Sequence, residues 1–153
     1  MRAVRLKEFG GPEMLVVGEA PEPVAGPGQD LIEVAFSNIT FVETQFRAGG
    51  FDPFSTELPT IPGNGGGGVV SSVGAGADGD LIGKRVVSGT GGSGGYAERV
   101  AVDTGGLFEV PDGRDLDRAV ALLADGRTAT MLVRKAGLRG GERALVEAAA
   151  CGS

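Results

Sequence analysis

The chain has 153 residues, a formal net charge of −6 and 41% apolar residues, which suffices for one domain with a buried core. It has no histidine and a single cysteine, which excludes histidine-based triads, disulfides within the chain and a four-ligand Cys/His zinc site. The acidic balance argues against nucleic acid or an anionic membrane as a partner. Without a long apolar run or a signal-peptide core, we expect a cytoplasmic protein with no membrane segment.

Glycine is the unusual component, with 29 glycines beside 8 prolines. Average usage of glycine is only about 7%, and no strict G-x-y period is present, so collagen is excluded. Such a composition indicates many turns and loops rather than a helical bundle.

Short strands are predicted along most of the chain. They fall at residues 2–8, 14–17, 31–39, 67–73, 84–88, 96–102 and 107–110. Alternation is clearest where Ile32, Val34 and Phe36 share one face of a strand. One short helix is predicted over residues 41–48, because Thr40 and Glu43 fit a capping box.

The C-terminal part predicts helices. Leu116, Ala119, Val120 and Leu123 follow helical spacing after Asp115. Gly126 is interpreted as the end of that helix, with a second helix from about 128 to 136, giving a helix pair over 114–137. A terminal strand is expected over 143–150.

These elements predict a mainly β fold with a few helices, namely a partly open β-barrel with peripheral helices. The chain is interpreted as one domain, 1–153. It comprises a β-rich barrel body over 1–113, then the helix pair and the terminal strand.

Two glycine motifs have structural explanations. Residues 74–79 match G-x-G-x-x-G, but the following segment is too short and glycine-broken for a nucleotide-binding helix, which favours a turn. Residues 91–95 match G-x-S-x-G, but no histidine is available as the base. This second segment is expected to be a flexible loop whose amides offer hydrogen bonds to an anionic or carbonyl oxygen.

Without histidine, proton transfer must use a carboxylate, tyrosine or lysine. The available acid–base or anchoring groups include Glu43, Arg47, Tyr96, Asp125 and Arg127. Each also has a structural interpretation: Glu43 caps its helix, Arg47 pairs with it at i,i+4, and Tyr96 is a half-buried strand residue.

Many segments in the same order resemble the quinone oxidoreductase-like medium-chain dehydrogenases/reductases. They are Met1-Arg2-Ala3-Val4, Phe9-Gly10-Gly11-Pro12-Glu13, Pro27-Gly28-Gln29, residues 41–49, Leu58-Pro59-Thr60-Ile61-Pro62-Gly63, Gly83-Lys84-Arg85-Val86-Val87, Gly94-Gly95-Tyr96-Ala97-Glu98 and Val110-Pro111-Asp112-Gly113. The resemblance implies a GroES-like domain, which in that family is followed by a Rossmann domain that binds NADPH. The missing Cys and His ligands fit the zinc-independent branch.

The departures from the family pattern shape the functional hypothesis. Gly65 stands where the family has an acidic residue. Residues 148–153, Ala-Ala-Ala-Cys-Gly-Ser, stand where the family has its nucleotide-binding turn, and the given sequence stops there. We therefore expect no Rossmann domain and no cofactor. With no histidine and one cysteine, we also expect no metal. The strand at 143–150 then resembles a remnant of the first Rossmann strand. Pairing of two such strands would make a homodimer.

The leading hypothesis is a cofactor-independent cyclase or isomerase acting on a hydrophobic polyketide-like or quinone-like molecule. The expected catalytic residues are Glu43, Tyr96 and Asp125. The expected substrate-binding residues are Thr40, Arg47, Gly65, Gly92, Ser93, Gly94, Arg127 and Thr128. The alternatives are the N-terminal piece of an NADPH-dependent quinone or enoyl oxidoreductase and a non-catalytic small-molecule binder.

Overall fold

The computed structural model describes residues 1–50 and 56–147. Its strands are β1 (Arg2–Leu6), β2 (Leu15–Glu19), β3 (Gln29–Ser37), β4 (Gly65–Val73), β5 (Arg85–Gly89), β6 (Arg99–Asp103) and β7 (Leu107–Glu109). The two α-helices are α1 (Phe41–Arg47) and α2 (Leu116–Ala136), and three single 3₁₀ turns lie at Pro12–Met14, Gly79–Leu81 and Thr104–Gly106.

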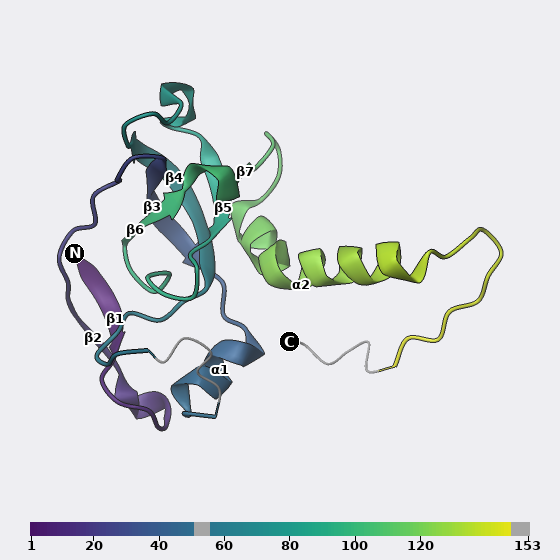
Figure 1. The fold of residues 1–153 in the computed structure, drawn as a ribbon, viewed down its shortest axis with the longest axis horizontal. Coiled ribbons are helices and arrows are strands. Elements are labelled where there is room, and N and C mark those ends of the chain that lie inside the picture. Colours follow the sequence, from purple (N-terminus) through teal and green to yellow (C-terminus); the bar gives the residue numbers. More distant parts are fainter. Residues whose placement is uncertain (51–55, 148–153) are drawn as a thin grey trace.

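The strands form two antiparallel sheets that curl around one body, from which α2 extends outward (Figure 1). The main sheet has five strands in the order β6-β3-β4-β5-β7, and β1 and β2 form a separate pair. Bridges at Ala3 with Ala97 and at Leu6 with Thr60 join the pair to the rest of the body. Neither sheet closes on itself, which confirms the predicted mainly β, partly open barrel with peripheral helices.

The core follows from the alternation of the strands. Ile32, Val70, Val86, Val100 and Val102 form one buried cluster between strands β3 to β6. A second cluster joins Val87, Val110 and Val120, and it attaches the first turns of α2 to the sheet.

Helix α2 is the largest difference from the sequence-based expectation. The predicted break at Gly126 is wrong, because one helix runs continuously from Leu116 to Ala136. Glycine inside a helix costs only about 1 kcal/mol relative to alanine, and packing of Val120 and Leu123 on the sheet offsets this. The helix ends where expected, at Gly137, which adopts the left-handed conformation.

The predicted terminal strand is not formed over the part of it that the structure describes. Residues 143–147 have no strand pairing, and Leu145 is 86% exposed. Residues 148–150 of that prediction lie outside the described residues. Pairing of two copies through this segment stays a prediction.

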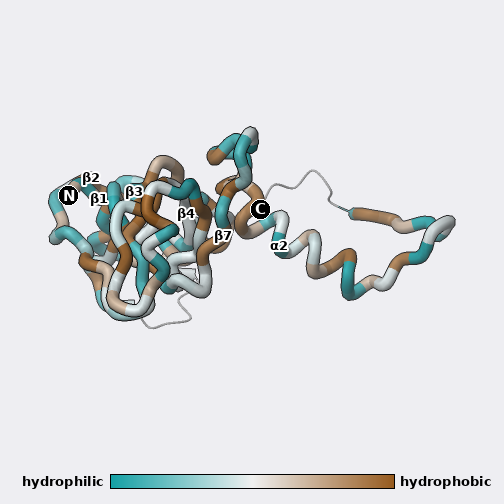
Figure 2. The backbone as a smooth tube through the Cα atoms, turned by 90° about the horizontal axis from the view of Figure 1, so that it is seen from above, coloured by the Kyte–Doolittle hydropathy of each residue, from teal (hydrophilic) through white to brown (hydrophobic). Residues whose placement is uncertain are grey.

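The hydropathy colouring shows apolar and polar residues along the projecting part of α2 (Figure 2). In the described ranges, no helix is long and apolar enough to cross a membrane.

Candidate functional site

The Glu43 carboxylate, in the first turn of α1, accepts hydrogen bonds from two separate segments of the chain. Its Oε2 accepts a hydrogen bond from the backbone N–H of Thr40 at 2.6 Å, as the predicted capping box requires. Its Oε1 accepts another from the N–H of Asn64 at 2.6 Å. The carboxylate therefore ties α1 to the segment that enters β4, and both of its oxygens are engaged.

Tyr96 lies beside this carboxylate. Burial raises the pKa of its hydroxyl well above the ordinary value of 10.0, and the nearby negative charge of Glu43 raises it further. The phenol therefore remains protonated at neutral pH. The structure thus brings together Glu43 and Tyr96, two of the three predicted catalytic residues, and their catalytic role stays a prediction.

Arg47 does not form the i,i+4 ion pair with Glu43 that its spacing suggests. Its Nη1 instead donates a hydrogen bond to the carbonyl oxygen of Gly10 at 2.6 Å, linking α1 to the loop after β1. Beside this link, the rings of Phe9 and Phe46 pack edge to face with centroids 5.6 Å apart.

The glycine loop has fewer free amides than its sequence suggests. The N–H of Gly94 donates to the carbonyl of Ile61 at 2.7 Å, and the N–H of Gly95 donates to Gly63 at 3.1 Å. The N–H groups of Gly94 and Gly95 therefore already have acceptors within the protein. Gly92 is half-buried and Ser93 is exposed, and their binding role stays a prediction.

Gly65 lies buried in β4, and helix α2 occupies the space beside it. A Cβ atom at Gly65 would approach Leu123 Cδ2 to 2.5 Å, and one at Gly67 would approach Val120 Cγ2 to 2.6 Å. Side chains of α2 therefore fill the space beside these glycines, and the substrate-binding role expected of Gly65 stays a prediction. The glycines allow α2 to pack directly on the strand.

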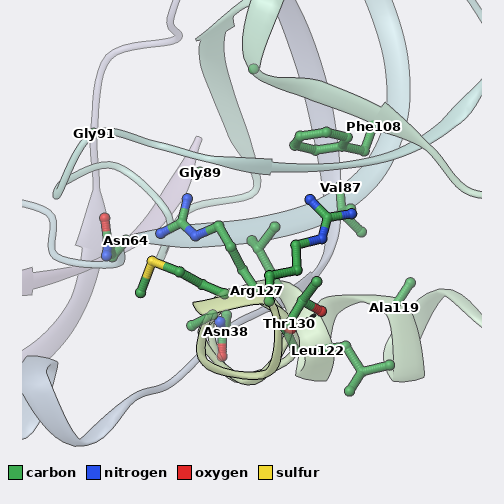
Figure 3. A pocket seen from close by; sticks show the side chains of 16 residues that line it. Asn38, Asn64, Val87, Gly89, Gly91, Phe108, Ala119, Leu122, Arg127 and Thr130 are labelled. Carbon is green, nitrogen blue, oxygen red and sulfur yellow. Dashed lines mark hydrogen bonds between the residues drawn. The ribbon is translucent and has the colours of Figure 1, made fainter. Parts of the chain in front are cut away.

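A groove of about 980 Å³ lies between α2 and the sheet, and its size suits a small molecule (Figure 3). Its apolar lining comes from Val87, Phe108, Ala119, Leu122, Leu123 and Met131. Its polar lining comes from Asn38, Asn64, Arg127, Thr130 and Arg134. Figure 3 shows the Arg127 side chain extending from the helix toward the strands.

Of the predicted site residues on α2, only Arg127 lines this groove. Asp125 and Thr128 are exposed on the helix and do not line it. Because α2 is continuous, these three residues do not form the turn between two helices that the sequence predicted.

The groove also contains residues that the sequence reasoning missed. Asn38, Asn64 and Phe108 come from segments far apart in the chain, and no local pattern identifies them. Arg134 could have been found from its spacing of seven residues after Arg127, provided that both were placed on one helix.

Among the described residues there is neither a metal-binding cluster nor an α-helix that directly follows the G-x-G-x-x-G motif. They contain no group of three or more Cys, Asp or Glu side chains arranged to hold a metal ion. The G-x-G-x-x-G segment leads into a 3₁₀ turn of three residues, not the α-helix whose N-terminus would face a pyrophosphate. The described residues therefore do not fit NADPH through this motif.

Comparison with known proteins identifies the class. Residues 26–112 match the family described as the alcohol dehydrogenase GroES-like domain, and the chain belongs to that family. Among curated proteins, it is 32% identical over 152 residues to the quinone oxidoreductase of Pseudomonas aeruginosa and 34% identical over 154 residues to that of Homo sapiens. Each match covers 99% of this chain but 46% of the relative.

Solved structures give the same result. The human synaptic vesicle membrane protein VAT-1 homolog-like protein has a TM-score of 0.86 and 30% identity, over 92% of this chain and 45% of that one. Mycobacterial Rv1454c complexed with NADPH has a TM-score of 0.82 and 31% identity, over 93% and 44%. The chain thus corresponds to the N-terminal half of quinone oxidoreductase-like medium-chain dehydrogenases/reductases, and spans about half the length of these relatives.

Proposed function

We propose that this chain binds and orients a quinone-like carbonyl compound, as the substrate-binding part of a quinone oxidoreductase-type enzyme. The groove along α2 carries the proposal, because it combines an apolar wall with side chains that donate hydrogen bonds. The relationship to quinone oxidoreductases supports the choice of substrate class.

The polar groups of the groove suit the polarisation of a carbonyl. The amide groups of Asn38 and Asn64 and the guanidinium of Arg127 all donate hydrogen bonds, so they favour negative charge that develops on a carbonyl oxygen. Glu43 acts as a positioning residue, because it holds the backbone of Asn64.

The groove has no Asp or Glu among its lining residues. Its lining therefore lacks a carboxylate that would serve as a general base. The lone tyrosine does not line the groove and is protonated at neutral pH. Such a site favours substrate binding and carbonyl polarisation over proton abstraction.

Reduction also needs a hydride, and NADPH is the group that supplies one when bound. The G-x-G-x-x-G segment does not fit its pyrophosphate, so we assign no step of that transfer to it. The contribution of this chain is to exclude water from one side of the substrate and to fix its orientation.

A cofactor-independent cyclase or isomerase for polyketide-like substrates is the second candidate. The observation that favours it is the same apolar groove, in a chain whose G-x-G-x-x-G segment does not fit a dinucleotide. Catalysis would then come from holding the substrate in a reactive conformation. A non-catalytic small-molecule binder would use the same groove without any conversion.

The test uses anthraquinone-2-carboxamide, a neutral quinone that resists addition of thiols. Calorimetric titration should detect binding to the purified chain, and a groove-filling variant such as Thr130→Trp should weaken it. A fluorescence titration should detect no NADPH binding to the chain alone. Absence of quinone binding would refute the proposal, and quinone-dependent oxidation of NADPH by this chain alone would overturn the division of roles.

A second arm tests the cyclase alternative. The chain is incubated with polyketide-like substrates without cofactor, and products are analysed by mass spectrometry. A product of unchanged mass but altered chromatographic position would establish the second candidate instead. Bound but unconverted ligand agrees with the proposed binding role.

A further inference from the structure

One face of α2 changes its chemistry along its length. In the first half, Val120 and Leu123 pack against the sheet at helical spacing. The same row continues through Arg127, Thr130 and Arg134, which lie at steps of three or four residues. The face that is apolar where it covers the sheet therefore becomes cationic where it borders the groove.

These two arginines have no ion-pair partner within residues 1–50 and 56–147. By contrast, Arg2 pairs with Glu98 at 2.7 Å and Arg99 pairs with Glu22 at 2.8 Å. The chain carries 20 acidic residues against 14 basic ones, so unpaired arginines are not a result of too few acids. The groove thus concentrates positive charge on an acidic protein.

Exposed apolar side chains lie beside this charge, two on α2 itself and one on β7. Phe108 is 63% exposed, Leu122 is 62% exposed and Met131 is 61% exposed, and all three line the groove. Large apolar side chains beside unpaired cations complement a ligand that has both an apolar ring system and an anionic group.

We infer that the groove selects an anionic aromatic carbonyl compound, such as a quinone that carries a carboxylate. Seven residues of helix separate the two arginines by about 10 Å along its axis. One guanidinium pairs with the carboxylate, and the other donates a hydrogen bond to a ring carbonyl oxygen. The ring system lies on the apolar wall. This inference rests on the proposed function and adds the charge of the substrate to it.

The test compares two ligands of nearly the same shape, anthraquinone-2-carboxylate and anthraquinone-2-carboxamide. We expect the full chain to bind the carboxylate about tenfold more tightly at low ionic strength, because a charge-assisted contact replaces a neutral one. The preference should shrink as salt is added, because the site is open to solvent.

Variants of Arg127 and Arg134 test whether these two residues cause the preference for the carboxylate ligand. In the double variant Arg127→Gln/Arg134→Gln, the two ligands should bind with nearly equal affinity. The matched control Lys135→Gln removes a neighbouring charge that does not line the groove, and it should keep most of the preference. Circular dichroism spectra verify folding, and the variant Arg127→Lys/Arg134→Lys, which keeps both charges, should retain part of the preference.

The outcomes separate the two proposals. If neither ligand binds, the proposed function fails and this inference fails with it. If both ligands bind equally to the unaltered chain, the proposed function stands and the anionic specificity is refuted. If the preference persists in the double glutamine variant, the assignment to Arg127 and Arg134 is refuted.

Discussion

The carboxylate of Glu43 accepts a hydrogen bond from the backbone N–H of Asn64 at 2.6 Å, across 21 residues of sequence. The same side chain caps the helix that it belongs to. A single carboxylate thus connects α1 with the residue that enters β4 and lines the groove.

Glu43→Gln should therefore lower the free energy of unfolding by about 1–3 kcal/mol. An amide has one oxygen, so one of the two backbone N–H groups would face another donor. Chemical denaturation measures the change, and Glu8→Gln, at an exposed residue, is the control. Equal stability of the two variants would contradict the role of the carboxylate as a structural link.

Tyr96 should resist ionisation in the native state. It is the only tyrosine and there is no tryptophan, so phenolate absorbance reports on this residue alone. Its native pKa lies above the ordinary 10.0, so its contribution to stability is fully present below about pH 10 and is lost as pH rises further. Absorbance titration should show no native midpoint near pH 10, whereas the denatured chain should show one there.

The variant Glu43→Gln tests, in the same titration, how much the neighbouring charge contributes to the raised pKa of Tyr96. Removing the neighbouring negative charge should bring the pKa of Tyr96 closer to its ordinary value, while burial continues to hold it above that value. A native midpoint that does not move would show that burial alone governs the hydroxyl.

Gly68→Ala should destabilise the protein by about 2–4 kcal/mol. A Cβ atom there would clash with the backbone carbonyl oxygen of Glu33, and this backbone atom cannot rotate away. The matched control is Gly79→Ala, where an added Cβ meets nothing within 4 Å. Thermal unfolding of the two variants should differ clearly, and similar curves would count against the close contact between β3 and β4.

Asp30→Asn should increase the free energy of unfolding at neutral pH by about 1–3 kcal/mol. The Asp30 side chain is 0% exposed, and neither carboxylate oxygen has a hydrogen-bond partner in the described parts of the chain. Denaturant titration tests this, with Asp103→Asn on the neighbouring strand as an exposed control. A loss of stability would reveal that the carboxylate has a partner, such as buried water.

The sequence predicted most of the body because its signals are local. Alternation identified β3, and the capping box identified α1. The helix break failed because Gly126 weakens a helix without ending it when neighbouring residues are packed. The terminal strand failed over residues 143–147 because apolar residues form a strand only when a partner strand is present.

Less of the candidate site than of the fold could be predicted from the sequence. Glu43 and Tyr96, both predicted to be catalytic, lie together, and their catalytic role stays a prediction. Asp125 was assigned to a turn that does not exist. The groove depends on how α2 crosses the sheet. Its lining residues Asn64 and Phe108 come from different segments, and only tertiary packing brings them together.

Strand β4 has no side chains at Gly65 and Gly67, and this limits which substitutions the protein tolerates there. In most cores, a new side chain is accommodated when its neighbours change rotamer. Beside Gly65, an added Cβ would first meet Leu123 Cδ2, the end of a side chain that can rotate. Beside Gly67 it would meet the Val120 side chain and also the backbone oxygen of Val86 at 2.8 Å, which cannot rotate away. The glycines of β4 thereby set how closely α2 approaches the sheet, and with it the width of the groove that Arg127 and Arg134 line.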